Sequence, residues 1–177
     1  MDRLKRLVRK IATMNSQILF LREQIIDTYE GEPWFGRNAK ELLSEVNEHD
    51  AFQKLAGEHS ILELVWHMIT WREFTISRIK NVEGKDLHFF EQYDWRELDH
   101  NDKKLWRQGL ERLKDTQNNL IKSIEELQDD LLEKMVAERN YNFKKLLHGI
   151  IQHDIYHLGQ IAYINKMLFK AQNITGV

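Results

Sequence analysis

Residues 142–168 read NFKKLLHGIIQHDIYHLGQIAYINKML, and this stretch decides the fold. Its apolar positions recur every three or four residues, the period that places side chains on one face of an α-helix. Asn142 stands before the first apolar position, where an Asn side chain can cap a helix. The stretch therefore predicts a long amphipathic helix whose buried stripe includes two histidines. That stripe is Leu146, Ile150, His153, His157, Ile161, Ile164 and Leu168.

Two segments nearer the N-terminus predict further helices. Residues 3–29 repeat apolar residues in a seven-residue step, which is typical of a bundle helix. Ser60 and Glu63 form a capping-box pattern, so a second helix is expected from there to about Asn81. The repeat in residues 3–29 has two interleaved rows. The first row is Leu4, Ile11, Ile18 and Ile25, and the second, offset by three residues, is Leu7, Met14 and Leu21.

A third helix is expected between the second and the last, capped by Asn101 or Asp99. Its apolar stripe is interrupted by Gln117 and otherwise consists of Trp106, Leu110, Leu113, Leu120, Ile124 and Leu127. Residues 31–59 are expected to be a long connection with a helical turn near residues 39–46, and residues 88–95 lie in a second connection. One proline and eight glycines in 177 residues leave few turns. The sequence predicts an all-α four-helix bundle with a single domain over residues 1–177.

Composition excludes several classes of protein. The chain has no cysteine, which rules out disulfide scaffolds, thiolate zinc sites and cysteine nucleophiles. No apolar run reaches the ~18 residues of a membrane span, and we expect a cytoplasmic protein without a leader segment. A net charge of −2 argues against a dedicated nucleic-acid binder. The basic residues at 3–10 leave a membrane-surface or nucleic-acid role as an alternative. A solvated face of a bundle helix is favoured, because the apolar pattern continues past the basic residues.

Histidine stands where the period demands an apolar residue at three positions. His153 and His157 are four apart on one helix face, and His67 shares the inward face of the second helix with Leu64 and Trp71. Three imidazoles from facing helices can converge on a metal ion and leave coordination positions open. The alternative is that each is a hydrogen-bonded core residue. The remaining histidines are expected at the surface: His49, His59, His88, His100 and His148.

Other metal and phosphate motifs do not fit. The zincin motif needs a glutamate after its first histidine, and the residue here is Asp154. A di-iron bundle needs two Glu-x-x-His motifs, whereas only Glu97 and His100 match, in an expected loop. Gly31 to Gly36 has the spacing of a P-loop but lacks its lysine and hydroxyl residue.

Two segments resemble the DinB / YfiT-like family. Residues 60–71, SILELVWHMITW, are similar to its first ligand segment, and residues 153–160, HDIYHLGQ, match the signature H-x-x-Y-H-x-G-Q of its last helix. The turn at Trp34 and the pair Asp94 and Trp95 are also similar. The resemblance implies a four-helix bundle with a divalent metal, zinc or nickel, bound by His67, His153 and His157. It also implies a tendency to form homodimers.

Some members of that family transfer groups to bacillithiol, mycothiol or glutathione. We therefore expect a metal-dependent thiol S-transferase or hydrolase that acts on a small-molecule substrate, with a low-molecular-weight thiol as a co-substrate. The alternative is a non-enzymatic dimeric bundle whose metal is structural or adventitious.

Several residues near the ligands are candidates for supporting roles. Asp154 and Tyr156 are the catalytic candidates, although Asp154 is rotated about 100° from His153 and could face a neighbouring helix instead. Gln160 lies beside the ligands in the sequence. Glu63 could orient His67, with helix capping as the alternative. Three tryptophans are candidates for a substrate entrance, with burial in the core as the alternative: Trp34, Trp71 and Trp95.

Overall fold

The computed structural model describes residues 15–55 and 57–175, and in these ranges it is helical without any strand. The all-α prediction is confirmed. The long helices are α2 (Ser16–Tyr29), α5 (Ile61–Lys80), α7 (Lys104–Glu125) and α8 (Phe143–Thr175). Shorter elements are α3 (Ala39–Ser44), α4 (Glu48–Ala51), α6 (Leu87–Gln92) and the 3-10 turn η1 (Asp129–Glu133).

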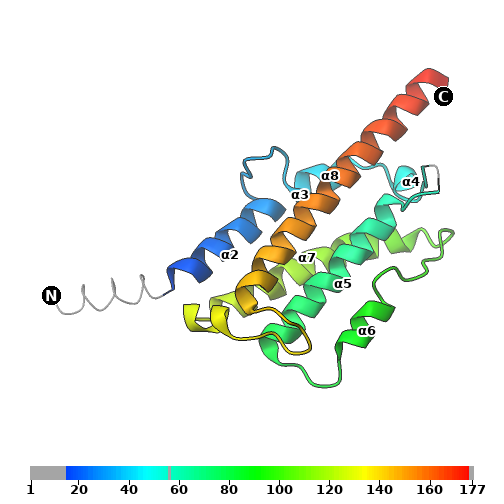
Figure 1. Ribbon diagram of the computed structural model, residues 1–177. Coiled ribbons are helices and arrows are strands. Elements are labelled where there is room, and N and C mark those ends of the chain that lie inside the picture. The colour runs from blue at the N-terminus through cyan, green and yellow to red at the C-terminus, as the bar shows by residue number, and fades with distance from the viewer. Residues whose placement is uncertain (1–14, 56, 176–177) are drawn as a thin grey trace.

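The four long helices pack side by side (Figure 1). Helix α5 contacts both α7 and α8, and α2 contacts the same two helices. Helix α6 lies against α5 (Figure 1). No described helix has the length and apolarity that crossing a bilayer requires.

The predicted caps of α5 and α8 are confirmed. The Ser60 side chain accepts a hydrogen bond from the Glu63 amide and the Glu63 carboxylate accepts one from the Ser60 amide, which satisfies two free donors of α5. Asn81 ends α5 in the left-handed conformation, at φ 49°. At the start of α8, Asn142 Oδ1 accepts from the Lys145 amide at 3.0 Å.

The predicted cap of α7 is wrong. The helix begins at Lys104, two residues later than an Asn101 cap allows, and the capping residue Lys103 makes no side-chain hydrogen bond to it. The Lys104 amide donates instead to Asp102 Oδ1 at 3.0 Å. Asp99 instead accepts from the Asn101 amide in a preceding turn. Asx residues favour such local turns as strongly as they favour caps, so the sequence signal was ambiguous.

The first expected helix is described only from Asn15 onward. Within α2, Ile18, Leu21 and Ile25 are buried, as the seven-residue pattern predicts. The earlier part of the pattern and its basic residues lie outside the described residues.

The two connections contain more helix than expected. Besides α3, which the predicted turn near residues 39–46 anticipates, the first connection contains α4, and the second contains α6. These helices of four and six residues are too short to show a period. Their signals are the capping residues Asn47 and Asp86, whose side chains accept hydrogen bonds from the backbone of α4 and α6.

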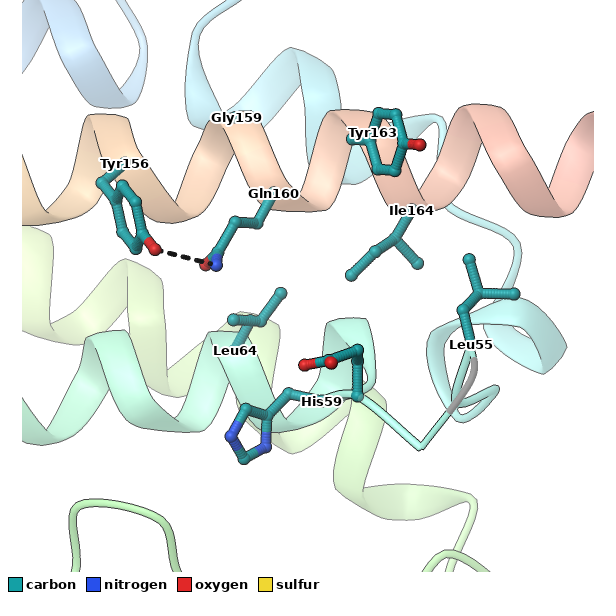
Figure 2. Close-up of a pocket in the computed structure, with 9 residues that line it drawn as sticks. Leu55, His59, Leu64, Tyr156, Gly159, Gln160, Tyr163 and Ile164 are labelled. Atoms are coloured by element: carbon teal, nitrogen blue, oxygen red, sulfur yellow. Dashed lines mark hydrogen bonds between the residues drawn. The ribbon is translucent and has the colours of Figure 1, made fainter.

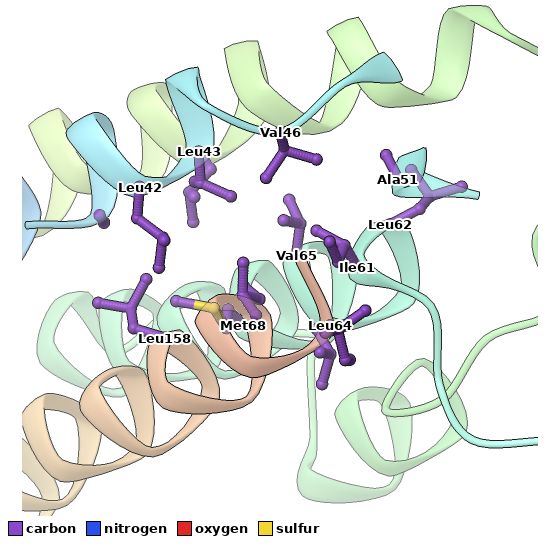
Figure 3. Packing of buried hydrophobic residues seen from close by; sticks show 14 of the residues in the cluster. Leu42, Leu43, Val46, Ala51, Ile61, Leu62, Leu64, Val65, Met68 and Leu158 are labelled. Atoms are coloured by element: carbon purple, nitrogen blue, oxygen red, sulfur yellow. The ribbon is translucent and has the colours of Figure 1, made fainter. Parts of the chain in front are cut away.

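The main hydrophobic cluster joins the connecting helices to α5 and α8. Figure 3 shows Leu42 and Leu43 of α3 facing Met68 of α5 and Leu158 of α8. This cluster packs α5 against α8. It therefore fixes the spacing between α5 and α8, which bear the three histidines.

Candidate metal centre

The structure brings His67 of α5 together with His153 and His157 of α8. The Nε2 atom of His153 lies 2.9 Å from that of His67 and 3.2 Å from that of His157. His67 and His157 are buried and His153 is half-buried. In the described part of the chain, these three form a group of His, Cys, Asp or Glu side chains able to hold one metal ion.

Oxygen acceptors fix the orientation of two of the rings. His67 Nδ1 lies 2.7 Å from Asp94 Oδ1 and 3.3 Å from the Asp94 carbonyl oxygen. His157 Nδ1 lies 2.6 Å from Gln160 Oε1. Oxygens of this kind only accept, so each Nδ1 is the protonated donor and each Nε2 carries a lone pair. Both rings thus have the tautomer that a metal-binding imidazole needs.

The electrostatics of the site favour the neutral rings. Burial lowers the pKa of His67, and the neighbouring His153 lowers it further against the opposing effect of Asp94. Burial and then His153 lower the pKa of His157 to about 4. Both imidazoles are therefore uncharged at neutral pH, as metal binding requires.

The donor set fits a divalent ion. Zinc–nitrogen bonds of about 2.0–2.1 Å place two ligand nitrogens about 3.3 Å apart at a tetrahedral angle and about 2.9 Å apart at a right angle. The two observed separations fall in this range. Two lone pairs at such distances repel one another unless a proton or a metal ion lies between them, and a metal ion can take all three nitrogens at once. Nickel and zinc both accept imidazole nitrogen, so the donors do not select between them.

A buried ion pair lies directly behind His153. Arg72 is fully buried, and its guanidinium donates to Asp154 Oδ2 from Nε at 3.0 Å and to Gln117 Oε1 from Nη1 at 2.9 Å. Burial raises the pKa of the Asp154 carboxyl, but the charge of Arg72, together with the Arg72 hydrogen bond and smaller contributions from His153, holds that pKa below its usual value. The other oxygen, Oδ1, lies 3.8 Å from His153 Nδ1. The catalytic candidate Asp154 thus faces α5 and the back of a ligand.

A stack of aromatic rings covers His67. Trp95 lies parallel to His67 with ring centroids 3.9 Å apart, and His59 lies parallel to the other face of Trp95 at 3.7 Å. Trp71 Nε1 donates to Asp94 Oδ1 at 2.6 Å, so the carboxylate that orients His67 is itself held. Asp94 and Trp95 come from the connection after α6, which closes over one side of the site.

Two pockets lie along α8 on either side of the histidines. The first, the Tyr156 pocket, has a volume of about 460 Å³ and is lined by residues that include His59, Leu64 and Gln160. Figure 2 shows Tyr156 and Gln160 of α8 on one side of it, with Leu64 and the backbone of His59 on the other. The second, the aromatic pocket, has a volume of about 280 Å³ and includes His153 in its wall.

Tyr156, the other catalytic candidate, lies at the rim of the Tyr156 pocket. It is 65% exposed, its ring packs edge-on against His157, and its hydroxyl accepts from Gln160 Nε2 at 3.4 Å. Its hydroxyl therefore faces the pocket beside a ligand.

Glu63 caps α5 and pairs with Lys54 at 2.7 Å, so the structure does not support its orienting His67. Burial raises the pKa of the Glu63 carboxyl, but hydrogen bonds from Lys54 and the Ser60 amide, together with the Lys54 charge, lower it to about 2. The carboxylate that does orient His67 is Asp94, which the sequence marked only as part of an Asp–Trp pair.

The tryptophans and the other histidines have mixed outcomes. Trp34 is fully exposed, so the alternative of burial in the core is wrong for it, and it lines neither pocket beside the histidines. Trp71 is half-buried in the wall of the aromatic pocket, and Trp95 covers His67. Four other histidines are exposed as expected, and His100 is half-buried, with Nδ1 3.1 Å from the Phe52 carbonyl.

Fold and site together define an all-helical protein with a candidate three-histidine metal centre between two packed helices. Residues 34–161 match the family model described as the DinB superfamily, and the chain belongs to that family. The match includes all three histidines, Asp94 and Gln160. No curated protein and no solved structure gives a significant match.

Proposed function

We propose that this protein is a metal-dependent enzyme that uses zinc or nickel at the three histidines and transfers a group to a low-molecular-weight thiol. The observation that carries this proposal is the convergence of the Nε2 atoms of three histidines beside open pockets. Three protein ligands with space beside them are the pattern of catalytic zinc, whereas structural zinc is closed by a fourth. Within residues 15–55 and 57–175, no fourth His, Cys, Asp or Glu joins the group.

When bound, a divalent ion with an open position lowers the pKa of a ligated water or thiol toward neutrality and so supplies a nucleophile. The chain contributes the rest. Asp94 and Gln160 keep Nε2 of His67 and His157 turned inward, and Trp95 shields the His67 face from water. Burial in this setting strengthens each electrostatic contact.

One observation favours thiol transfer over hydrolysis. Transfer needs two substrates, and two pockets flank the histidine group. Because the chain has no cysteine, the sulfur nucleophile of such a transfer comes from the co-substrate. Hydrolysis, which needs one organic substrate and water, is the second candidate.

The first test is metal content. Untagged protein reconstituted with zinc or nickel is expected to hold about one ion per chain by mass spectrometry. The ion should be absent from His153→Ala and retained in His148→Ala, a matched change of an exposed histidine on the same helix. Stoichiometric zinc in His153→Ala would contradict the proposal that the three histidines bind the metal.

The second test is the reaction. The zinc- or nickel-loaded protein is incubated with glutathione or bacillithiol and 1-chloro-2,4-dinitrobenzene. The thiolate sulfur forms a bond to the aryl carbon, chloride leaves with its electron pair, and the thiol proton passes to solvent. Thioether formation that depends on metal supports transfer, and hydrolytic products from ester substrates without any thiol would favour the hydrolase. Stoichiometric metal with neither activity over a broad electrophile and ester panel would favour the non-enzymatic bundle.

We also propose a homodimer. Tyr156 and Tyr163, seven residues apart on α8, are both 65% exposed, an unusual exposure for two aromatic side chains on one face. Sedimentation equilibrium measures the mass directly, and a monomer at micromolar concentration would contradict the proposal.

A further inference from the structure

We propose that the aromatic pocket binds an acidic apolar substrate, with its anionic group at Lys145 and its reacting carbon beside His153. This inference rests on the proposed function, since it names the class of electrophile that the enzyme would accept.

The wall of the aromatic pocket is mostly apolar and comes from two helices and one loop. Trp71 and Phe74 lie on α5, Leu146 and Ile150 lie on α8, and Tyr141 precedes α8. The Tyr141 backbone is held because its carbonyl accepts from the Val136 amide at 2.9 Å. An apolar wall with a few polar groups at its ends is the usual form of a small-molecule site.

The charges around this wall are positive. Lys145 lies in the wall with its Nζ 5.6 Å from the Tyr141 ring centroid. The Arg139 guanidinium, outside the wall itself, lies 5.3–5.9 Å from the ring centroids of Trp71, Phe74 and Tyr141. Among the described residues neither cation has a carboxylate partner, and no Asp or Glu lines the pocket. An anionic ligand would supply the missing counter-charge.

The position of the cation sets the length of the ligand. Lys145 and His153 are eight residues apart on α8, which is about 12 Å along the helix axis. The Lys145 Nζ lies beside the ring of Tyr141, which precedes α8, so a ligand anchored there needs an elongated apolar body, such as a fused bicyclic ring, to extend toward His153. A pocket of about 280 Å³ accommodates a molecule of that size.

Gly149 gives the pocket its depth. A glycine inside a helix costs about 1 kcal/mol of stability relative to alanine, so it needs a reason. Close packing is not the reason here, because a Cβ atom at Gly149 would meet nothing within 4 Å. Gly109 of α7 differs, since a Cβ there would lie 3.1 Å from Trp66 Nε1. Gly149 lies in the wall of the aromatic pocket, where its missing side chain leaves room for a ligand.

The Tyr156 pocket provides a matched control. Gly159, also on α8, lines that pocket, and a Cβ there also meets nothing within 4 Å. Its wall contains Glu58, which disfavours an anion. A leucine at Gly149 therefore fills the aromatic pocket and leaves the Tyr156 pocket open, and a leucine at Gly159 does the reverse.

The experiment is equilibrium dialysis of naphthalene-2-carboxylate against the full chain treated with chelator, so that the carboxylate cannot bind a metal. We expect binding that Gly149→Leu weakens at least about tenfold and Gly159→Leu changes less than about twofold. Gly149→Val serves as the second variant if Gly149→Leu does not fold by circular dichroism. Naphthalene-2-carboxamide, the neutral isostere, is expected to bind about threefold or more weakly.

Lysine variants test the charge separately. Lys145→Gln should weaken binding of the acid about threefold and leave binding of the amide unchanged. Lys144→Gln is the control, because Lys144 is hydrogen-bonded to Gln17 and lies outside the wall. Equal binding of acid and amide, or an equal loss in Gly149→Leu and Gly159→Leu, would overturn the proposal.

The two proposals fail in different ways. If the metal-free chain binds the acid but binds no zinc or nickel after reconstitution, the proposed ligand of the aromatic pocket is supported and the proposed function is contradicted. If the chain binds one metal ion but does not bind the acid, the proposed function stands and the inference about the aromatic pocket is overturned.

Discussion

Removing the Asp94 carboxylate is expected to weaken metal binding without touching a ligand. Asp94 Oδ1 accepts from His67 Nδ1 at 2.7 Å and from Trp71 Nε1 at 2.6 Å. In Asp94→Ala, His67 Nδ1 retains only the backbone carbonyl at 3.3 Å, and the Trp71 donor loses its partner. The ring can then turn Nε2 away from the other histidines, and its basicity falls.

The expected loss follows from the number of contacts removed. Loss of such a supporting hydrogen bond typically costs 10–100-fold in metal affinity, or about 1.4–2.7 kcal/mol. Asp94→Ala loses both the bond and the charge, so we expect about 100-fold. Asp94→Asn keeps an oxygen acceptor and loses only the charge, so we expect about tenfold.

Two assays measure this effect. Competition with a chromophoric chelator gives the zinc dissociation constant directly. Zinc at 100 times the wild-type dissociation constant stabilises the folded state by about 2.7 kcal/mol, against about 0.4 kcal/mol in a variant with 100-fold weaker binding. For a chain of this size the zinc-induced rise in Tm should fall from about 5–10 °C to about 1 °C.

The control is Asp99→Ala, an exposed aspartate in the same connection whose carboxylate accepts from the Asn101 amide. It should bind zinc as the wild type does. Zinc affinity in Asp94→Ala within about threefold of wild type would refute the role assigned to Asp94, and an equal loss in Asp99→Ala would show a general effect on the connection.

Three further changes have defined outcomes. Asp154→Ala leaves Arg72 buried without its counter-charge and should lower the free energy of unfolding in urea by about 3–5 kcal/mol, whereas adding Arg72→Met should recover most of it. Glu63→Gln keeps the cap but removes a carboxylate whose pKa is about 2. Since that pKa is below the unfolded value of 4.5, wild type should be more stable by about 1–2 kcal/mol at pH 7, after allowance for solvent screening, and the difference should shrink between pH 4.5 and 2 in urea titrations. Gln160→Leu removes the acceptor of His157 Nδ1 and should weaken zinc binding about tenfold in the chelator competition.

The long helices could be predicted because each has a face that stays buried over many turns. The period identified α5, α7 and α8, and it also marked Gln117 as an interruption. In the structure Gln117 is buried on the stripe, where it accepts from Arg72 and donates to the Ile25 carbonyl at 3.3 Å. A polar residue in an apolar stripe thus signalled a buried polar network, but the period cannot name its partner on another helix.

The same limit applies to the site. His67, His153 and His157 were found because each occupies an apolar position on a predicted face. Asp94 was not found in its role, because it lies in a connection without a period, 27 residues from His67. Only the packing of that connection against α5 brings the two together.

The position of Asp154 shows how one helix serves both stability and the site. Because a helix turns by about 100° per residue, His153 can face the other histidines while Asp154 faces Arg72. The Arg72 pair fixes the rotation of α8 relative to α5, since any turn of α8 would separate two buried charges. That rotation is the one that places His153 Nε2 2.9 Å from His67 Nε2. The buried ion pair therefore sets the register in which the two helices present their nitrogens, and Asp154→Ala with Arg72→Met should restore stability more fully than it restores zinc affinity.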